Sequence, residues 1–424
     1  MRLSSQSMKS EPIQADTRPR RIVFLISSFR GVNTGVGGHY RSVKEISALL
    51  SDIAEVQVVT FGDVPSPVFE GHQAYTHIQA WSCFSLSGII RFRRFLREFS
   101  GDMGGRTVVI SVGWIISYVV AALASVGSNL TRLHVRPGGE APQHPRIFNG
   151  VCMGLFHQKD VDLFQSLDPR RTLALVPGRV TPPAFDPAFV RSSNRPFDTD
   201  ARLKILCIMR IASDKRRPSR LIYEALEQAG GGAPPLPVTF THCGTIQDES
   251  LYAELATRKL GIESAFVTDS LTTGSAPKYL YGHDAFVGIG RSVIEAMSVG
   301  IPAFIPVIKA RSEIKLCAVT ANNWQQFLRE NFTHRTTYSA LEECGEVICL
   351  EDFARNRDLQ KRLTEEVRKI YDENLSPAAS LQTWRELLSE EHSSPSVAGD
   401  IGRAIYALYP EFKRMLSLGL RLRH

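Results

Sequence analysis

Short apolar segments alternate with longer amphipathic segments along most of the chain. The apolar segments are rich in β-branched residues, as in 22–27 and 203–209, and this pattern is typical of buried strands. The amphipathic segments keep their apolar residues on one helical face, as in 39–50. Strands that alternate with helices in this way predict an α/β protein, in which helices cover both faces of parallel sheets.

The strand and helix segments fall into two series, 21–185 and 203–375. We expect 186–202 to be a linker, because it continues a proline-rich stretch without a strand or helix pattern. Helices in 376–424 are expected to follow and to be able to cross back to the first domain, and the polar segment 1–20 is expected to be disordered. Two such Rossmann-like domains face each other across a cleft at the carboxyl ends of their strands, where a ligand is expected to bind.

Residues 107–126 are long and apolar enough to suggest a membrane span, since 15 of the 20 residues are apolar and none is charged. However, β-branched residues fill the first half and alanines the second, with Gly113 between them. This pattern predicts a buried strand followed by a buried helix. The apolar run after Arg21 is about seven residues long and lacks a small-residue cleavage site, so it predicts a first strand rather than an export signal.

Composition fits a folded protein of two or three domains at about 150 residues per domain. The 424 residues are 43% hydrophobic and 22% charged, which excludes a disordered chain and a polytopic membrane protein. The net charge of +7 suits anionic partners such as phosphates or anionic lipid, but it is too dilute to indicate nucleic acid. Seven scattered cysteines without a C-x-x-C pair predict neither disulfides nor a zinc site, and favour a reducing cytoplasm.

Three segments carry candidate chemistry at strand-to-helix turns. In the first, Arg210 and Lys215 flank the turn after the strand 203–209. A guanidinium, an ammonium and a helix N-terminus together suit a diphosphate, although cations in a loop often face only solvent. Arg216 and Arg217 add more charge than a phosphate site needs, so at least one of them is expected to be solvated.

The second segment is DAFVGIGRSVIEAMSVGIP. Gly288 and Gly290 give a turn whose backbone N–H groups suit a phosphate, and Ser292 is expected to cap the following helix. Glu295 lies one turn inside that helix and is placed to accept the hydroxyls of a ribose. Alternatively, it is a solvated carboxylate that compensates the helix dipole.

The third segment is GVNTGVGGHYRS, in which Gly37 and Gly38 precede a helix. Glycines permit close approach of a ligand to the backbone, but the spacing does not match G-x-G-x-x-G. Taken alone, this segment predicts a tight turn.

In this order, the segments resemble a family 4 glycosyltransferase of the GT-B fold, also called glycosyl transferases group 1. The resemblance spans most of the chain and rests on the R-x4-K of Arg210 and Lys215 and on E-A-M-x-x-G-x-P from Glu295. Gly37–Gly38 and the segment LALVPGRVTPPAF add to it. It implies that Arg210 and Lys215 hold the diphosphate of a nucleotide-sugar donor, that Glu295 holds its ribose, and that Gly290, Arg291 and Ser292 surround its phosphates. Gly37 and Gly38 are also expected to bind the donor.

The sequence departs from the family at one position. The E-x7-E motif of the family places an acid eight residues before Glu295, and here that residue is Val287. The departure puts contacts to the donor sugar in doubt. The family also tends to carry a histidine after an inner strand of the first domain, and His134 and Arg136 are the nearest candidates.

The resemblance implies sugar transfer with retention and without metal, with the nucleotide sugar as co-substrate and no cofactor. The first domain is expected to receive a glycan or lipid-linked acceptor, and the protein to act in polysaccharide biosynthesis in the cytoplasm, in part on the inner face of the membrane. A sugar-nucleotide epimerase and a non-catalytic nucleotide-sugar-binding protein of the same fold remain the alternatives.

Two basic amphipathic segments bear on a membrane surface. Residues 88–99 interleave Phe92, Phe95 and Leu96 with four arginines, and residues 401–424 carry five cations and one acid. Such segments can lie on anionic lipid. The alternative is that both are ordinary helices whose apolar faces pack against the core.

Overall fold

The computed structural model describes residues 19–389 apart from several short segments. The segments left out are 30–36, 83–84, 102–105, 114, 129, 138–147, 149–150, 170–171, 186–201, 233–235, 270–275 and 312. Nearly all of the expected linker 186–202 and of the N-terminal segment 1–20 therefore lies outside the described residues, and so does the tail 390–424.

The first half of the chain forms a parallel sheet of seven described strands in the order β3-β2-β1-β4-β5-β6-β7. The strands are β1 (Arg21–Ser28), β2 (Glu55–Gly62), β3 (Tyr75–Gln79), β4 (Thr107–Val112), β5 (Thr131–Arg136), β6 (Cys152–Leu155) and β7 (Leu173–Leu175). Helices cover the sheet: α1 (Gly38–Leu50), the short η1 (Pro67–Phe69), α2 (Leu86–Ser100), α3 (Ile115–Ala124) and α4 (Gln158–Leu167).

The second half forms a six-stranded sheet, counted over described residues, in the order β10-β9-β8-β11-β12-β13. Its strands are β8 (Leu203–Ile208), β9 (Val238–Cys243), β10 (Glu263–Val267), β11 (Ala285–Val287), β12 (Ala303–Ala310) and β13 (Glu313–Ala318). Its helices are η4 (Ser213–Lys215), α5 (Arg216–Gly230), α6 (Glu249–Ala256), η5 (Ala276–Gly282), α8 (Arg291–Ser298), α9 (Trp324–Arg329), α10 (Tyr338–Glu342), α11 (Leu350–Arg355) and α12 (Arg357–Ile370).

The sheets are parallel as expected, except at one edge of the second sheet. Strand β13 pairs antiparallel with β12. The physical reason is the connection, because the two residues between these strands allow a hairpin, whereas a parallel return needs a crossover of a dozen or more residues.

The apolar segment 107–126 is a strand followed by a helix, as its pattern predicts. All residues of β4 are buried, and apolar side chains of α3 pack against one face of the sheet. Among the described residues, none of the helices combines the length and apolarity that a membrane crossing requires.

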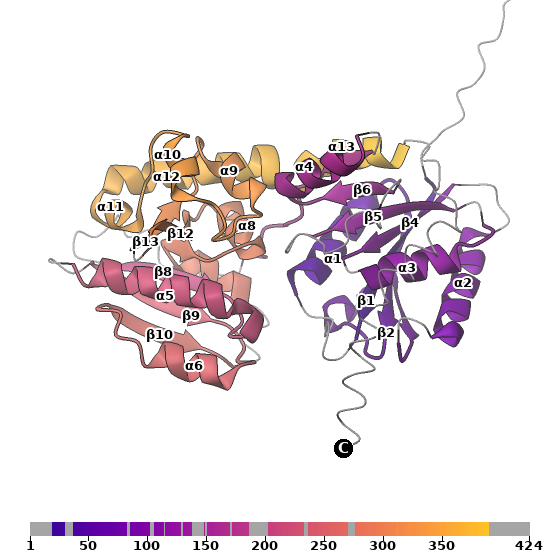
Figure 1. Cartoon of the computed structure of the whole chain (residues 1–424), viewed down its shortest axis with the longest axis horizontal. Coiled ribbons are helices and arrows are strands. Elements are labelled where there is room, and N and C mark those ends of the chain that lie inside the picture. Colours follow the sequence, from indigo (N-terminus) through magenta and orange to yellow (C-terminus); the bar gives the residue numbers. More distant parts are fainter. Residues whose placement is uncertain are drawn as a thin grey trace, which may run out of the picture.

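The chain passes twice between the two domains, and the two passages lie side by side. Gly178 lies so close to Ser376 that a Cβ on Gly178 would lie 2.1 Å from the Ser376 carbonyl oxygen. The Tyr371 hydroxyl in the π-helical turn η6 (Tyr371–Leu375) donates to the Val180 carbonyl at 2.6 Å. Helix α13 (Pro377–Ser389) then crosses to the first domain, where Trp384 is buried in the core beside α1 and β7 (Figure 1).

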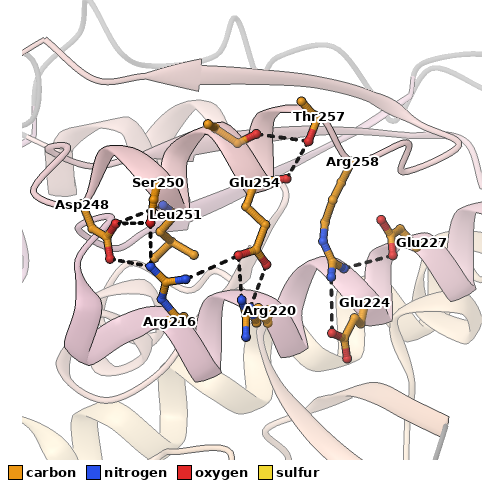
Figure 2. Close-up of polar contacts among 11 residues, drawn as sticks. Arg216, Arg220, Glu224, Glu227, Asp248, Ser250, Leu251, Glu254, Thr257 and Arg258 are labelled. Atoms are coloured by element: carbon orange, nitrogen blue, oxygen red, sulfur yellow. Dashed lines mark hydrogen bonds and ion pairs between the residues drawn. The ribbon is translucent and has the colours of Figure 1, made fainter.

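An arginine-rich network joins α5 to α6 behind the β8–α5 turn (Figure 2). Arg216 donates to Asp248 at 2.9 Å and to Ser250 at 2.8 Å, and Arg220 forms two bonds of 2.7 Å to Glu254. Asp248 also accepts from the Leu251 N–H as the N-cap of α6. Arg216 therefore fixes the position of the helix that follows Lys215.

This network predicts an acid-sensitive contribution to stability. The bond from Arg216, together with those from Leu251 and Ser250, lowers the Asp248 pKa to about 2. Because the folded-state pKa lies below the unfolded value of about 3.9, the stabilisation is present above pH 4 and is lost as the pH falls towards 2. We expect Asp248→Asn, which keeps a capping side chain, to destabilise the protein at pH 6 but not at pH 2, as measured by urea unfolding.

The matched control is Glu263→Gln, which removes the exposed pair with Arg202 and should change stability little at either pH. A loss of stability in Asp248→Asn that is equal at pH 6 and pH 2 would show that charge pairing with Arg216 is not its cause.

Candidate functional site

Arg210 and Lys215 converge on one anionic oxygen at the carboxyl end of β8. Arg210 Nη2 donates to Asp214 Oδ2 at 2.8 Å, and Lys215 Nζ lies 3.5 Å from the same oxygen. Arg210 Nη1 donates to Gln247 at 2.8 Å. Asp214 is 53% exposed, so its carboxylate can move away and leave both cations to a diphosphate beside the N-terminus of α5.

A second strand-to-helix turn lies next to it, between β11 and α8. Gly290 has a φ of 67°, which favours glycine, and its N–H donates to the Phe332 carbonyl at 2.7 Å. Glu295 is buried in α8 and accepts from Arg291 Nε at 2.8 Å. The expected cap by Ser292 is wrong, because α8 begins at Arg291 and the Ser292 hydroxyl donates back to the Ile289 carbonyl at 3.1 Å.

Arg291 connects α8 to the first domain. Its guanidinium donates to Ser42 at 3.0 Å, to the Arg179 carbonyl at 2.8 Å and to Glu45, in addition to Glu295. A Cβ on Gly38 would lie 3.4 Å from Arg291 Cδ, so the Gly37–Gly38 turn and the start of α8 are neighbours. The side chain of Arg291 is therefore engaged between the domains, and any contact with phosphate near Gly290 would come from backbone N–H groups of the first turn of α8.

Three histidines have a lowered pKa because they are buried and lie near arginines or lysines. Burial lowers the pKa of His39 to about 4, with the charge of Arg210 adding to the shift. Burial also lowers the pKa of His334 to about 4, with Arg217, Arg335 and Lys215 adding to it, and that of His157 to about 3. All three imidazoles are neutral at pH 7. The cations near His39 and His334 favour an anionic ligand, whereas His157 also lies 3.3 Å from the carboxylate of Asp160.

His39 was missed by the sequence reasoning, although it directly follows the Gly37–Gly38 pair. It lies in the first turn of α1, and its electrostatic coupling to Arg210 places it near the diphosphate candidates. His157 was missed because the strand before it, β6, has only four residues and gave no strand signal.

His134 belongs to the core of the first domain. Its side chain is fully buried on β5, stacks 4.6 Å from the ring of Phe148 and pairs with Ser111 at 3.0 Å, so it cannot reach an acceptor. Arg136, at the end of the same strand, pairs with Asp160 at 2.5 Å.

Val287 is also buried, in the core of the second domain. The side chain at this position therefore packs against other apolar groups and supplies no contact to a donor sugar. Across the part of the chain that the structure describes, no three His, Cys, Asp or Glu side chains are grouped so that they could hold a metal ion.

The fold is the α/β GT-B fold, with two facing Rossmann-like domains. The chain is similar to a glycosyltransferase from Rickettsia africae ESF-5, with a TM-score of 0.57 and 13% identity over 88% of this chain and 100% of that one. It is also similar to the lipopolysaccharide outer core galactosyltransferase WaaB (TM-score 0.53, 13% identity, 87% and 99% covered). A third match is a putative UDP-N-acetylglucosamine 2-epimerase from Listeria monocytogenes (TM-score 0.50, 12% identity, 86% and 95% covered).

At these identities the similarity shows the fold alone. No family model matches the chain, and no curated protein is significantly similar to it in sequence. Function therefore has to be argued from the site.

Proposed function

We propose that the protein is a glycosyltransferase that moves a sugar from a nucleotide-diphospho-sugar to a glycan or lipid-linked acceptor. One observation carries the proposal: Arg210 and Lys215 both contact the carboxylate oxygen Oδ2 of Asp214. They lie at the carboxyl end of β8 and the start of α5. Two cations that contact one anionic oxygen beside a helix N-terminus are suited to the diphosphate of such a donor.

The rest of the donor would lie along the start of α8. Glu295 would accept the ribose hydroxyls, and the first-turn N–H groups of Arg291 and Ser292 would face the phosphates. His39 approaches from the first domain beside Gly37 and Gly38. The acceptor would then enter from the first domain, on the side of His39.

We propose that transfer proceeds with retention and needs neither metal nor cofactor. The bond between the anomeric carbon and the diphosphate oxygen breaks, and that oxygen keeps the electron pair. The acceptor hydroxyl oxygen bonds to the anomeric carbon on the same face, and its proton passes to the departing diphosphate oxygen. Arg210 and Lys215 would stabilise the negative charge that develops on the leaving diphosphate.

Epimerases share the fold, so the fold does not separate the two reactions. The epimerase alternative needs paired acids in the site, whereas Val287 is buried and apolar where the second acid would stand. The absent acid is also the one feature that supports a non-catalytic sugar-nucleotide-binding protein.

Release of nucleoside diphosphate from UDP-, GDP- and ADP-sugars, with and without an acceptor extract, distinguishes the three functions. A transferase releases diphosphate with one donor and does so faster when acceptor is present. An epimerase converts the sugar without needing an acceptor, and a binding protein leaves the donor intact. Either of the last two results would contradict the proposal.

Glu295 gives a separate prediction about the ribose. We expect Glu295→Gln to weaken binding of the cognate nucleoside diphosphate about tenfold, because an amide accepts hydroxyl hydrogen bonds less strongly than a carboxylate. Calorimetry with the 2′,3′-dideoxy analogue is the control. Removing the hydroxyls should cost affinity in the parent protein but little in the variant, and an equal cost in both would remove Glu295 from the ribose site.

A further inference from the structure

Exposed apolar side chains gather where β3 leads into α2. Trp81, Leu86 and Ile90 are 81%, 70% and 51% exposed. Within the described part of the chain, they are three of the five large apolar side chains that are markedly exposed, and they lie within ten residues of one another. We call this surface, made of Trp81, Leu86 and Ile90, the α2 patch.

The α2 patch is distinct from the apolar face that the sequence pattern indicated. Phe92 and Leu96 are buried in the core of the first domain, and Phe95 packs partly against it, so this face of α2 is an ordinary core-packing face. The exposed apolar side chains lie instead at the start of the helix and in the turn before it. Burial in the core therefore does not explain them.

The first turn of α2 is held firmly to the sheet. Ser85 caps the helix by accepting from the Gly88 N–H, and Arg91 donates to the carbonyl of Gln79 at 2.5 Å. The Ala80 N–H donates to the Gly62 carbonyl at 2.7 Å. The α2 patch is thus displayed on a fixed support.

Exposed arginines follow the α2 patch along the same helix. Arg91, Arg94 and Arg97 are exposed on α2, against one exposed acid, Glu98. Apolar side chains beside several arginines complement a surface that is anionic outside and apolar beneath. A second copy of this surface would oppose arginines with arginines, and the tail 401–424 is itself basic, with five cations and one acid.

The position of α2 suits attachment without blocking the site. Figure 1 shows α2 on the outer side of the first domain, away from the second domain. Its first turn follows the carboxyl end of β3. Because β1 and β3 are parallel, this is the same end of the sheet as the one where α1, with His39 in its first turn, follows β1.

We propose that the α2 patch docks the protein on an anionic lipid bilayer, with Trp81, Leu86 and Ile90 inserted at the headgroup level and the arginines against lipid phosphates. A bilayer held at this edge would present a lipid-embedded molecule to the first domain. Docking does not depend on the proposed sugar transfer, because it is measured without a donor.

The test is co-sedimentation of the full chain with vesicles of phosphatidylcholine containing 30% phosphatidylglycerol, and with vesicles of phosphatidylcholine alone. We expect binding to the anionic vesicles only, weakened by salt. Trp81→Ser and the double variant Leu86→Ser, Ile90→Ser should each lower the partition coefficient about tenfold or more, since each removes apolar area that would enter the bilayer. Arg94→Glu should lower it about tenfold.

Ile308→Ser is the matched control, because Ile308 is an exposed apolar residue of the second domain. It should bind like the parent. Three results would overturn the proposal: no binding of the parent to anionic vesicles, equal binding to neutral ones, or α2-patch variants that bind as well as Ile308→Ser. Because every variant is also assayed for nucleoside diphosphate binding, a failure of docking is distinguishable from a failure of the proposed function.

Discussion

Alanine at Lys215 is expected to slow sugar transfer about a hundredfold. Lys215 Nζ lies 3.5 Å from Asp214 Oδ2, which Arg210 also contacts. We expect an oxygen of the leaving diphosphate to take the position of this carboxylate oxygen. A charge-assisted contact that strengthens in the transition state is worth about 3 kcal/mol, which corresponds to roughly two orders of magnitude in rate. The measurement is kcat/KM for release of nucleoside diphosphate in the presence of acceptor.

Lys204→Ala is the matched control for this variant. Lys204 is exposed on β8, at the opposite end of the strand from Lys215, and its loss should leave the rate unchanged. Thermal unfolding of both variants checks that the fold is retained. If Lys215→Ala turns over like Lys204→Ala, the assigned role is lost.

Removing Arg291 is expected to cost stability rather than a single catalytic contact. The Arg291 side chain is 11% exposed and lies between Glu45 of α1 and Glu295 of α8, both largely buried. Alanine there leaves two carboxylates without their shared cation, and breaking a buried pair from one side costs about 3 kcal/mol. Urea unfolding of Arg291→Ala against the parent measures this loss.

The loss should also depend on pH. Burial raises the pKa of Glu45, and Arg291 opposes that rise, so the variant should raise the pKa further. When the folded-state pKa of a carboxyl lies above its unfolded-state value, the free energy of unfolding falls as the pH rises from the unfolded-state pKa to the folded-state pKa. The deficit is therefore expected to be larger at pH 7 than at pH 5.

Arg362→Ala provides the comparison, because Arg362 forms a solvent-exposed pair with Glu346. We expect it to cost less than about 1 kcal/mol. An Arg291→Ala variant that is no less stable than Arg362→Ala would show that Arg291 does not hold the domains together.

The hydrophobic pattern predicts most of the strands and the strand-to-helix turns, because buried strands and amphipathic helices differ in periodicity. It misses β3, β6 and β13, since β3 is half-polar, β6 is only four residues long with a glycine, and β13 begins with alternating charged and apolar residues. All three still add to a sheet through backbone hydrogen bonds, which leave little trace in side-chain pattern.

At the site, local spacing predicts Arg210 and Lys215, which lie five positions apart on one turn. It cannot predict that Arg291 contacts Glu45, because these residues are 246 positions apart and meet only when the domains are assembled. The same is true of His39 and Arg210, whose coupling joins two domains. Ser292 does not cap α8, because the helix begins at Arg291 and its N-cap is Gly290. The observed N-cap therefore lies two residues before the expected one, and sequence patterns often misplace helix ends by this much.

A crystal structure with a bound nucleoside diphosphate or nucleotide sugar tests the position of the donor most directly. We predict the diphosphate within hydrogen-bond distance of Arg210 and Lys215, with Asp214 turned away and the ribose hydroxyls on Glu295. A nucleotide bound elsewhere, or a diphosphate that touches neither Arg210 nor Lys215, would contradict the account.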